Sequence, residues 1–138
     1  MVNRHSLDVV IALRNRPEIF ECARSLLTIA AVSQILIVDS NSTCKATRES
    51  LEGLASNSHI RVISQKSVRQ FNKAQLLNMG LRESKAKFVL VSDADIIWNS
   101  ETVDCMLRKA RQGLCYVHHV VETRQRATAL ARPRCGEG

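Results

Sequence analysis

The sequence has 138 residues, of which 45% are hydrophobic, 24% charged and 4% aromatic, and its formal net charge is +7. This length suits one domain with a buried core and excludes two, and the composition is that of a soluble globular protein. The positive charge favours an anionic partner such as a phosphate, a nucleic acid or a membrane surface, while the scarcity of aromatic residues disfavours a stacking surface for single-stranded nucleic acid.

Strand and helix patterns alternate from residue 8 onwards. Residues 8–13 form an apolar run that indicates a buried strand, and Pro17 then stands at the favoured first position of a helix. The apolar face of that helix is expected to carry Ile19, Ala23, Leu26, Leu27 and Ala30. A second strand at 34–38, a short helix at 45–55 and a third strand at 60–63 follow.

The same rhythm continues through the second half of the chain. Residues 71–84 have a helical pattern, and residues 87–92 form a fourth apolar run. The apolar stripe of the helix at 71–84 is expected to consist of Phe71, Ala74, Leu77 and Leu81. Another helix is marked by Val103, Met106, Leu107 and Ala110. Gly113 is its expected end, and residues 114–121 are a last strand candidate.

The alternation predicts an α/β fold with a doubly wound, mostly parallel sheet and flanking helices. We expect the domain to cover residues 1–121 and residues 122–138 to form a poorly ordered tail, because the composition there becomes rich in arginine and ends in glycines. No apolar stretch approaches the length of a transmembrane helix. The five cysteines lack C-x-x-C spacing, so reduced thiols and a cytoplasmic location are expected.

The segment Asp93-Ala94-Asp95 follows the fourth strand directly and carries the strongest chemical signal. Two carboxylates one residue apart repel each other unless a cation lies between them. Magnesium and manganese typically take one or two protein carboxylates and complete their shell with water and phosphate oxygens. The alternative is an acidic loop without a ligand, since D-x-D patterns also arise by chance.

Two further polar clusters follow predicted strands, namely residues 14–16 after the first strand and residues 39–42 after the second. Taken singly, Asp39 is typical of a turn residue, and Arg14 and Arg16 are typical of solvated surface groups. In a parallel sheet, however, all three clusters would meet at the carboxyl edge, where open α/β sheets bind their ligands. Neither a G-x-G-x-x-G nor a P-loop motif is present.

Four segments in order and spacing resemble the motifs of family 2 glycosyltransferases, over residues 7–112. These segments are residues 9–17 (VVIALRNRP), 37–42 (IVDSNS), 71–80 (FNKAQLLNMG) and 90–95 (LVSDAD). The helix motif is most similar to that of the chondroitin-polymerase-like branch.

The resemblance implies the nucleotide-sugar-binding half of a GT-A fold, with a UDP-sugar donor and Mn²⁺ or Mg²⁺. In such enzymes the segment after the first strand wraps the nucleotide, the acid after the second reads the uracil ring, and the helix motif supplies a basic group and an amide. The D-x-D motif contacts the ribose and the metal. The corresponding nucleotide-sugar-binding residues are Ala12, Leu13, Arg14, Asn15, Asp39, Lys73, Asn78 and Asp93, and the metal ligands are Asp95 and Asp93.

The sequence departs from the family where catalysis would be completed. The carboxylate base of inverting members lies well beyond the D-x-D motif, and none of the acids after Asp95 stands in a recognisable base motif. His118 and His119 would point to opposite faces of a strand, which favours packed or surface roles. The catalytic residue therefore stays unknown, and we expect the chain to be a truncated glycosyltransferase.

Three functions follow, in order of preference. The first is a glycosyltransferase, or its donor-binding half, that transfers a sugar from a UDP-sugar to a saccharide or other hydroxyl acceptor. The second is a catalytically silent nucleotide-sugar-binding module. The third, a basic nucleic-acid-binding domain, is disfavoured because carboxylates at the predicted ligand edge would repel a phosphate backbone. The acceptor, the stereochemical outcome and the oligomeric state are left open.

Overall fold

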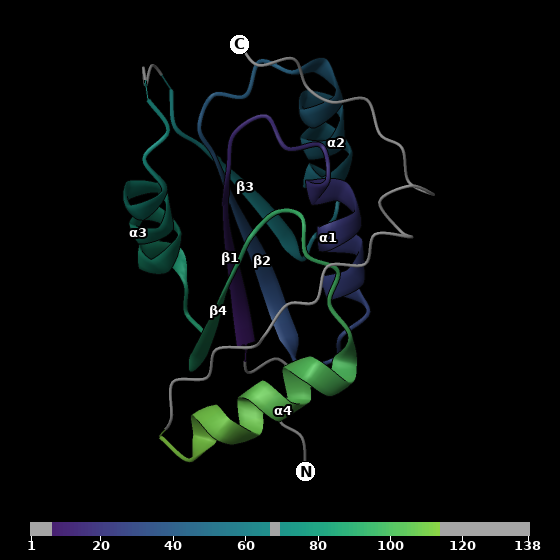
Figure 1. Ribbon diagram of the computed structural model, residues 1–138, viewed down its shortest axis with the longest axis vertical. Helices are drawn as coiled ribbons and strands as arrows, with labels where there is room; N and C mark the ends of the chain where they lie inside the picture. Colours follow the sequence, from purple (N-terminus) through teal and green to yellow (C-terminus); the bar gives the residue numbers. More distant parts are fainter. Residues whose placement is uncertain (1–6, 67–69, 114–138) are drawn as a thin grey trace.

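The computed structural model describes residues 7–66 and 70–113, and its centre is a parallel sheet with the strand order β3-β2-β1-β4. The strands are β1 (Leu7–Leu13), β2 (Val32–Asp39), β3 (Ile60–Ser64) and β4 (Phe88–Ser92). The helices are α1 (Ile19–Leu27), α2 (Lys45–Ala55), α3 (Lys73–Glu83) and α4 (Ser100–Arg111). Figure 1 shows α3 on one side of the sheet and α1 and α2 on the other. The predicted doubly wound α/β class is confirmed.

β1 is the central element of the described sheet, since β2 pairs with one side of it and β4 with the other. All seven of its side chains are buried. Val9 and Ile11 belong to the large core that includes residues of α1, α2 and α4, whereas Ala12 packs with Leu76 on the α3 side. A strand covered on both faces reads as an uninterrupted apolar run, which is why residues 8–13 were recognisable.

α3 approaches the sheet through Gly80 rather than through the predicted stripe. A Cβ atom at Gly80 would lie 2.4 Å from a methyl carbon of Val10, so only glycine allows this separation. Leu76 is fully buried one turn earlier. Of the predicted stripe, Phe71 and Leu81 are exposed large hydrophobic residues and Ala74 is exposed, so the prediction was wrong for these three. The half-buried Leu77 does pack against the core on this side of the sheet.

The other helices end close to their expected limits. α2 spans the predicted residues, and α4 begins after Asn99, whose side chain accepts a hydrogen bond from the Thr102 N–H. Gly113 follows Gln112, the C-cap of α4, and has a φ of +80°, as expected for a terminating glycine. Ala30, predicted on the apolar face of α1, instead lies beyond the end of that helix and is exposed.

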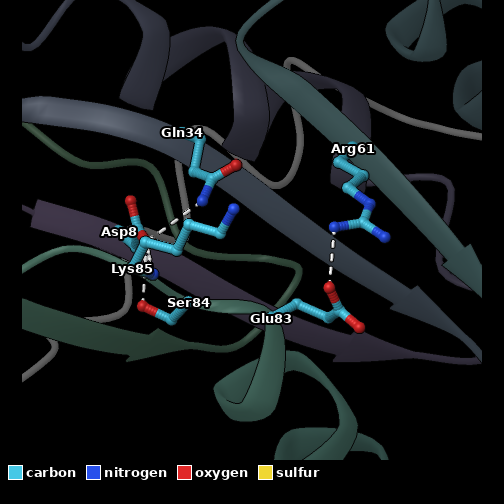
Figure 2. Close-up of polar contacts among 6 residues, drawn as sticks. All are labelled: Asp8, Gln34, Arg61, Glu83, Ser84 and Lys85. Atoms are coloured by element: carbon cyan, nitrogen blue, oxygen red, sulfur yellow. Dashed lines mark hydrogen bonds and ion pairs between the residues drawn. The ribbon is translucent and has the colours of Figure 1, made fainter.

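Polar contacts connect the elements at the amino-terminal ends of the strands, which we call the amino edge of the sheet (Figure 2). One carboxylate oxygen of the buried Asp8 accepts hydrogen bonds from the Gln34 side chain, the Ser84 hydroxyl and the backbone N–H groups of Lys85 and Ala86. These contacts tie the connection between α3 and β4 to β1. Separately, Arg61 of β3 pairs with Glu83 at the end of α3, at 2.8 Å.

Three further sets of expectations concern the C-terminal segment, membrane spans and the cysteines. The strand candidate at 114–121, His118, His119, the domain boundary at 121 and the tail at 122–138 lie outside the described residues. Among residues 7–66 and 70–113, no helix combines the length and apolar character that a bilayer span requires. Cys22 and Cys105 are free thiols, as expected, but Cys44 is disulfide-bonded, so the expectation of reduced thiols was wrong there.

Candidate functional site

Three polar loops leave the sheet at its carboxyl edge. They follow β2, β1 and β4, which are neighbours in the sheet. Asp39 is the last residue of β2, and the loops after β1 and β4 carry residues 14–16 and residues 93–95. The first two loops are joined directly, because the Ser40 N–H donates to the Leu13 carbonyl oxygen at 3.0 Å. The sheet order therefore brings together the three clusters that are far apart in the sequence.

Asp39 is held in one orientation by Ser42. The Ser42 hydroxyl donates to one carboxylate oxygen of Asp39 at 2.5 Å, and the Ser42 N–H donates to the other at 3.3 Å. Asp39 is 8% exposed. A carboxylate can accept about four hydrogen bonds, so Asp39 keeps the capacity to accept one from a ligand at the edge of the sheet.

Asn15 clamps the loop after β1 to the loop after β2. Its φ is +52°, a left-handed conformation that asparagine tolerates better than most residues. Its side-chain oxygen accepts hydrogen bonds from the N–H groups of Thr43 at 2.8 Å and Cys44 at 2.9 Å, and its own N–H donates to the Ser42 hydroxyl at 2.9 Å. Asn15 thus satisfies backbone groups at the start of α2 and supports Ser42 against Asp39.

Lys73 and Asp93 form an ion pair across the site. The Lys73 ammonium nitrogen lies 2.5 Å from one carboxylate oxygen of Asp93. Both side chains remain about half exposed, at 48% and 57%, so the pair faces water and is only moderately strong. Lys73 is the first residue of α3, and Asp93 follows β4 directly. The structure thereby joins a basic residue that the resemblance implied near the nucleotide and a carboxylate that it implied at the ribose and the metal.

The loop that carries Asp93 and Asp95 is anchored to α1 from behind. The Cys22 thiol donates to the Asp93 carbonyl oxygen at 3.5 Å, and the Trp98 N–H donates to the Ser25 hydroxyl at 3.0 Å. The Trp98 ring N–H also donates to the Ser92 hydroxyl at 2.8 Å. Burial raises the pKa of the Cys22 thiol to about 12, so this group stays protonated and acts as a hydrogen-bond donor.

The donor set at Asp93 and Asp95 fits a cation shared with a phosphate ligand. Both residues are exposed on the same loop and supply hard carboxylate oxygens. Within the part of the chain that the structure describes, no group of three or more His, Cys, Asp or Glu side chains is arranged to hold a metal ion. The residues therefore fit Mg²⁺ or Mn²⁺ completed by water and diphosphate oxygens, and they do not fit an all-protein metal cage.

Other predicted site residues are placed differently. Ala12 and Leu13 have buried side chains, so a nucleotide could meet only their backbone. Arg14 is half-buried, and Arg16 is exposed. Asn78 is exposed near the middle of α3 and, at the helical period, points away from the face that carries Leu76 and Gly80. Asn78 takes no part in the Lys73–Asp93 ion pair, and its place near the nucleotide stays a prediction.

Four supporting residues were not foreseen, namely Cys22, Ser25, Ser42 and Trp98. Ser42 had a sequence signal, because a serine three residues after an aspartate in a turn commonly hydrogen-bonds back to it. Cys22 and Ser25 had none, since an α1 residue that contacts a loop some 70 positions later is determined only by tertiary packing.

The comparisons with known proteins agree with this geometry. The family described as "Glycosyl transferase family 2" matches residues 8–134. No protein of curated function matches the sequence.

Solved structures resemble the chain at low sequence identity. The mannosyltransferase PcManGT from Pyrobaculum calidifontis, in complex with GDP-Man and Mn²⁺, has a TM-score of 0.65 and 23% identity over 76% of this chain and 32% of its own. The S. aureus protein TarS 1-349, in complex with UDP-GlcNAc, has a TM-score of 0.64 and 21% identity over 77% of this chain and 31% of its own. These likenesses establish the fold, and the chain spans about a third of the length of both structures.

Proposed function

Because the chain belongs to glycosyl transferase family 2, we propose that it binds a UDP-sugar with Mn²⁺ or Mg²⁺ as the donor-binding part of a glycosyltransferase. The observation that carries the proposal is the meeting of three clusters at the carboxyl edges of β2, β1 and β4. Basic, acidic and amide groups gather there, at the edge where open α/β sheets bind ligands. The neighbouring structures with GDP-Man and Mn²⁺ and with UDP-GlcNAc support a nucleotide-sugar ligand.

Each group at this edge has a chemical task in the proposal. Asp39, oriented by Ser42, accepts the ring N–H of uracil, and the backbone after β1 lies along the nucleotide. Asp93 and Asp95 hold the cation, which when bound would neutralise the diphosphate and stabilise its departure. Lys73 adds a positive charge for the phosphates.

A second candidate is donor binding without sugar transfer. Of the described acids after Asp95, Glu101 and Asp104 both belong to α4, which lies toward the edge at which the strands begin (Figure 1). The described residues beyond the D-x-D segment thus present no carboxylate at the ligand edge that could deprotonate an acceptor. The first proposal also includes sugar transfer to a saccharide or other hydroxyl acceptor. It further includes membership of the chondroitin-polymerase-like branch, which the motif at residues 71–80 supports.

The first prediction tests the metal-dependent donor site. Without a cation, a diphosphate that approaches Asp93 and Asp95 meets like charges, so UDP should bind weakly in chelator. Mn²⁺ and UDP should bind cooperatively, each raising the affinity of the other by the same factor. Calorimetric titration of UDP with and without Mn²⁺, and of Mn²⁺ with and without UDP, measures both sides of this coupling.

Variants at the same loop provide the controls. Asp95→Ala should abolish the coupling while leaving the thermal unfolding midpoint nearly unchanged, since an exposed carboxylate contributes little to the core. The exposed Glu49 on α2 supplies the matched variant, Glu49→Gln, which should preserve the coupling. Equal UDP affinity in Mn²⁺ and in chelator would contradict the proposed function.

A further inference from the structure

We propose that Lys73 is a built-in competitor for the metal site: it holds Asp93 while the site is empty and moves to the diphosphate when cation and donor bind together. This inference rests on the proposed function and adds a partner exchange to it. Its starting point is the contact between the Lys73 ammonium and an Asp93 carboxylate oxygen, at 2.5 Å. That oxygen belongs to a group that a metal ion would need.

The fold directs both members of the pair toward each other. Lys73 opens α3 directly after Asn72, whose side chain caps the helix by accepting a hydrogen bond from the Gln75 N–H at 3.1 Å. Gly80 seats the same helix tightly on β1. On the other side, the Cys22 thiol holds the backbone at Asp93. The pair therefore joins two supported elements rather than two mobile loops.

The two carboxylates of the loop differ in their partners. Lys73 pairs with Asp93, whereas Asp95 forms no ion pair with any residue that the structure describes. Lys73, Asp93 and Asp95 together carry a net charge of −1, and the two aspartates without Lys73 would carry −2. A free divalent cation consequently meets a weaker attraction, because an ammonium already occupies one of its ligands.

Both half-exposed side chains can separate without opening the core. When a cation takes the Asp93 oxygen, Lys73 loses its counter-charge and becomes available to a phosphate oxygen. When a diphosphate attracts Lys73, Asp93 becomes available to the cation. Each ligand thus removes an obstacle to the other, which makes Lys73 a source of the coupling and not merely one more positive charge.

The experiment compares Lys73→Met with Lys87→Met. Lys87 precedes β4, at the opposite end of that strand from Asp93, and its ammonium lies 5.5 Å from the centre of the Phe88 ring, so Lys87→Met removes the same charge away from the site. Mn²⁺ affinity without nucleotide is measured by electron paramagnetic resonance of the free ion. Terbium emission excited through Trp98, the only tryptophan, reports whether the ion binds at this loop.

In Lys73→Met, Mn²⁺ alone should bind about two- to fivefold more tightly than in the unmodified protein, the range expected for an exposed ion pair. UDP at saturating Mn²⁺ should bind more weakly, so the coupling factor falls from both sides. Lys73→Arg should keep the unmodified Mn²⁺ affinity, because it keeps the charge. Lys87→Met should change neither affinity.

The ion titration needs no nucleotide, so it separates the two proposals. If UDP fails to bind every form, the proposed function fails, while the Mn²⁺ comparison still decides whether Lys73 competes for the site. Mn²⁺ affinity in Lys73→Met no higher than in Lys87→Met would overturn the inference. So would the absence of terbium emission in every form.

Discussion

At the scale of single residues, Asp39 depends on neighbours that the chain brings to it from two loops. Ser42 binds both carboxylate oxygens, and Asn15 supports Ser42 through its N–H. A carboxylate oriented in this way presents its remaining acceptor positions in a defined direction. That is the condition for distinguishing one nucleobase from another, because base recognition depends on the placement of single donors and acceptors.

The base preference can be measured directly. If Asp39 accepts the N3–H of uracil, UDP should bind more tightly than CDP, which has no N–H at that position. Asp39→Asn should reduce the preference, since its amide can turn either its oxygen or its NH₂ group toward the ring. Calorimetry with both nucleotides in Mn²⁺ tests this, and equal affinities in the unmodified protein would remove Asp39 from the role.

At the scale of elements, α3 shows how packing can oppose a hydrophobic pattern. Its sheet-facing side includes Leu76 and Gly80, and its larger apolar residues Phe71 and Leu81 lie partly in solvent. A glycine contributes no hydrophobic signal, yet its missing Cβ allows the helix to approach β1 closely. The position of α3 matters for the site because Lys73 stands at its first residue.

Two glycine variants test this helix packing. Gly80→Ala should destabilise the protein by about 1–2 kcal/mol, because overpacking against Val10 outweighs the better helix propensity of alanine. Gly53→Ala on α2 is the matched control: a Cβ there meets nothing within 4 Å, so stability should rise by about 0.5–1 kcal/mol. Urea unfolding measures both values. A stabilised Gly80→Ala would show that α3 can move away from the sheet at little cost.

At the scale of the whole molecule, the two ends of the sheet have different tasks. The carboxyl edge carries half-exposed charged groups suited to ligands, and the amino edge is tied together by the buried Asp8. Burial alone would raise the pKa of Asp8, but hydrogen bonds from Gln34, Ser84, Lys85 and Ala86 outweigh it and lower that pKa below its ordinary value. The charged form of Asp8 therefore stabilises the fold.

The pH dependence follows from the direction of this shift. A lowered pKa in the folded state contributes stability that is fully present above the ordinary aspartate pKa, near 3.9, and is lost as the pH falls through the folded value. Asp8→Asn should reduce the free energy of unfolding by about 2 kcal/mol at pH 7 and by progressively less in acid. Urea unfolding from pH 7 to pH 3 checks this, with the exposed variant Glu49→Gln as control. A constant difference across that range would contradict the assignment.

The sequence by itself determined the order of strands and helices, the α/β class and the family motifs. These features are local: β1 and β2 are covered on both faces and appear as apolar runs, and α2 was delimited to the residue. Clusters that directly follow strands could also be assigned to one edge, because parallel strands all end on the same side of a sheet.

Only the tertiary structure decided which of these groups touch. Two of these contacts join positions far apart in the chain, namely the pairing of Lys73 with Asp93 and the anchoring of the Asp93 loop by Cys22. The support of Asp39 by Ser42 and Asn15 depends on the backbone conformation of two neighbouring loops. No hydrophobic period encodes them. The role of Gly80 also appears only in the folded protein. Because glycine has no Cβ, α3 can lie close to the sheet, and only the positions of Val10 and Val38 show that a Cβ would not fit there.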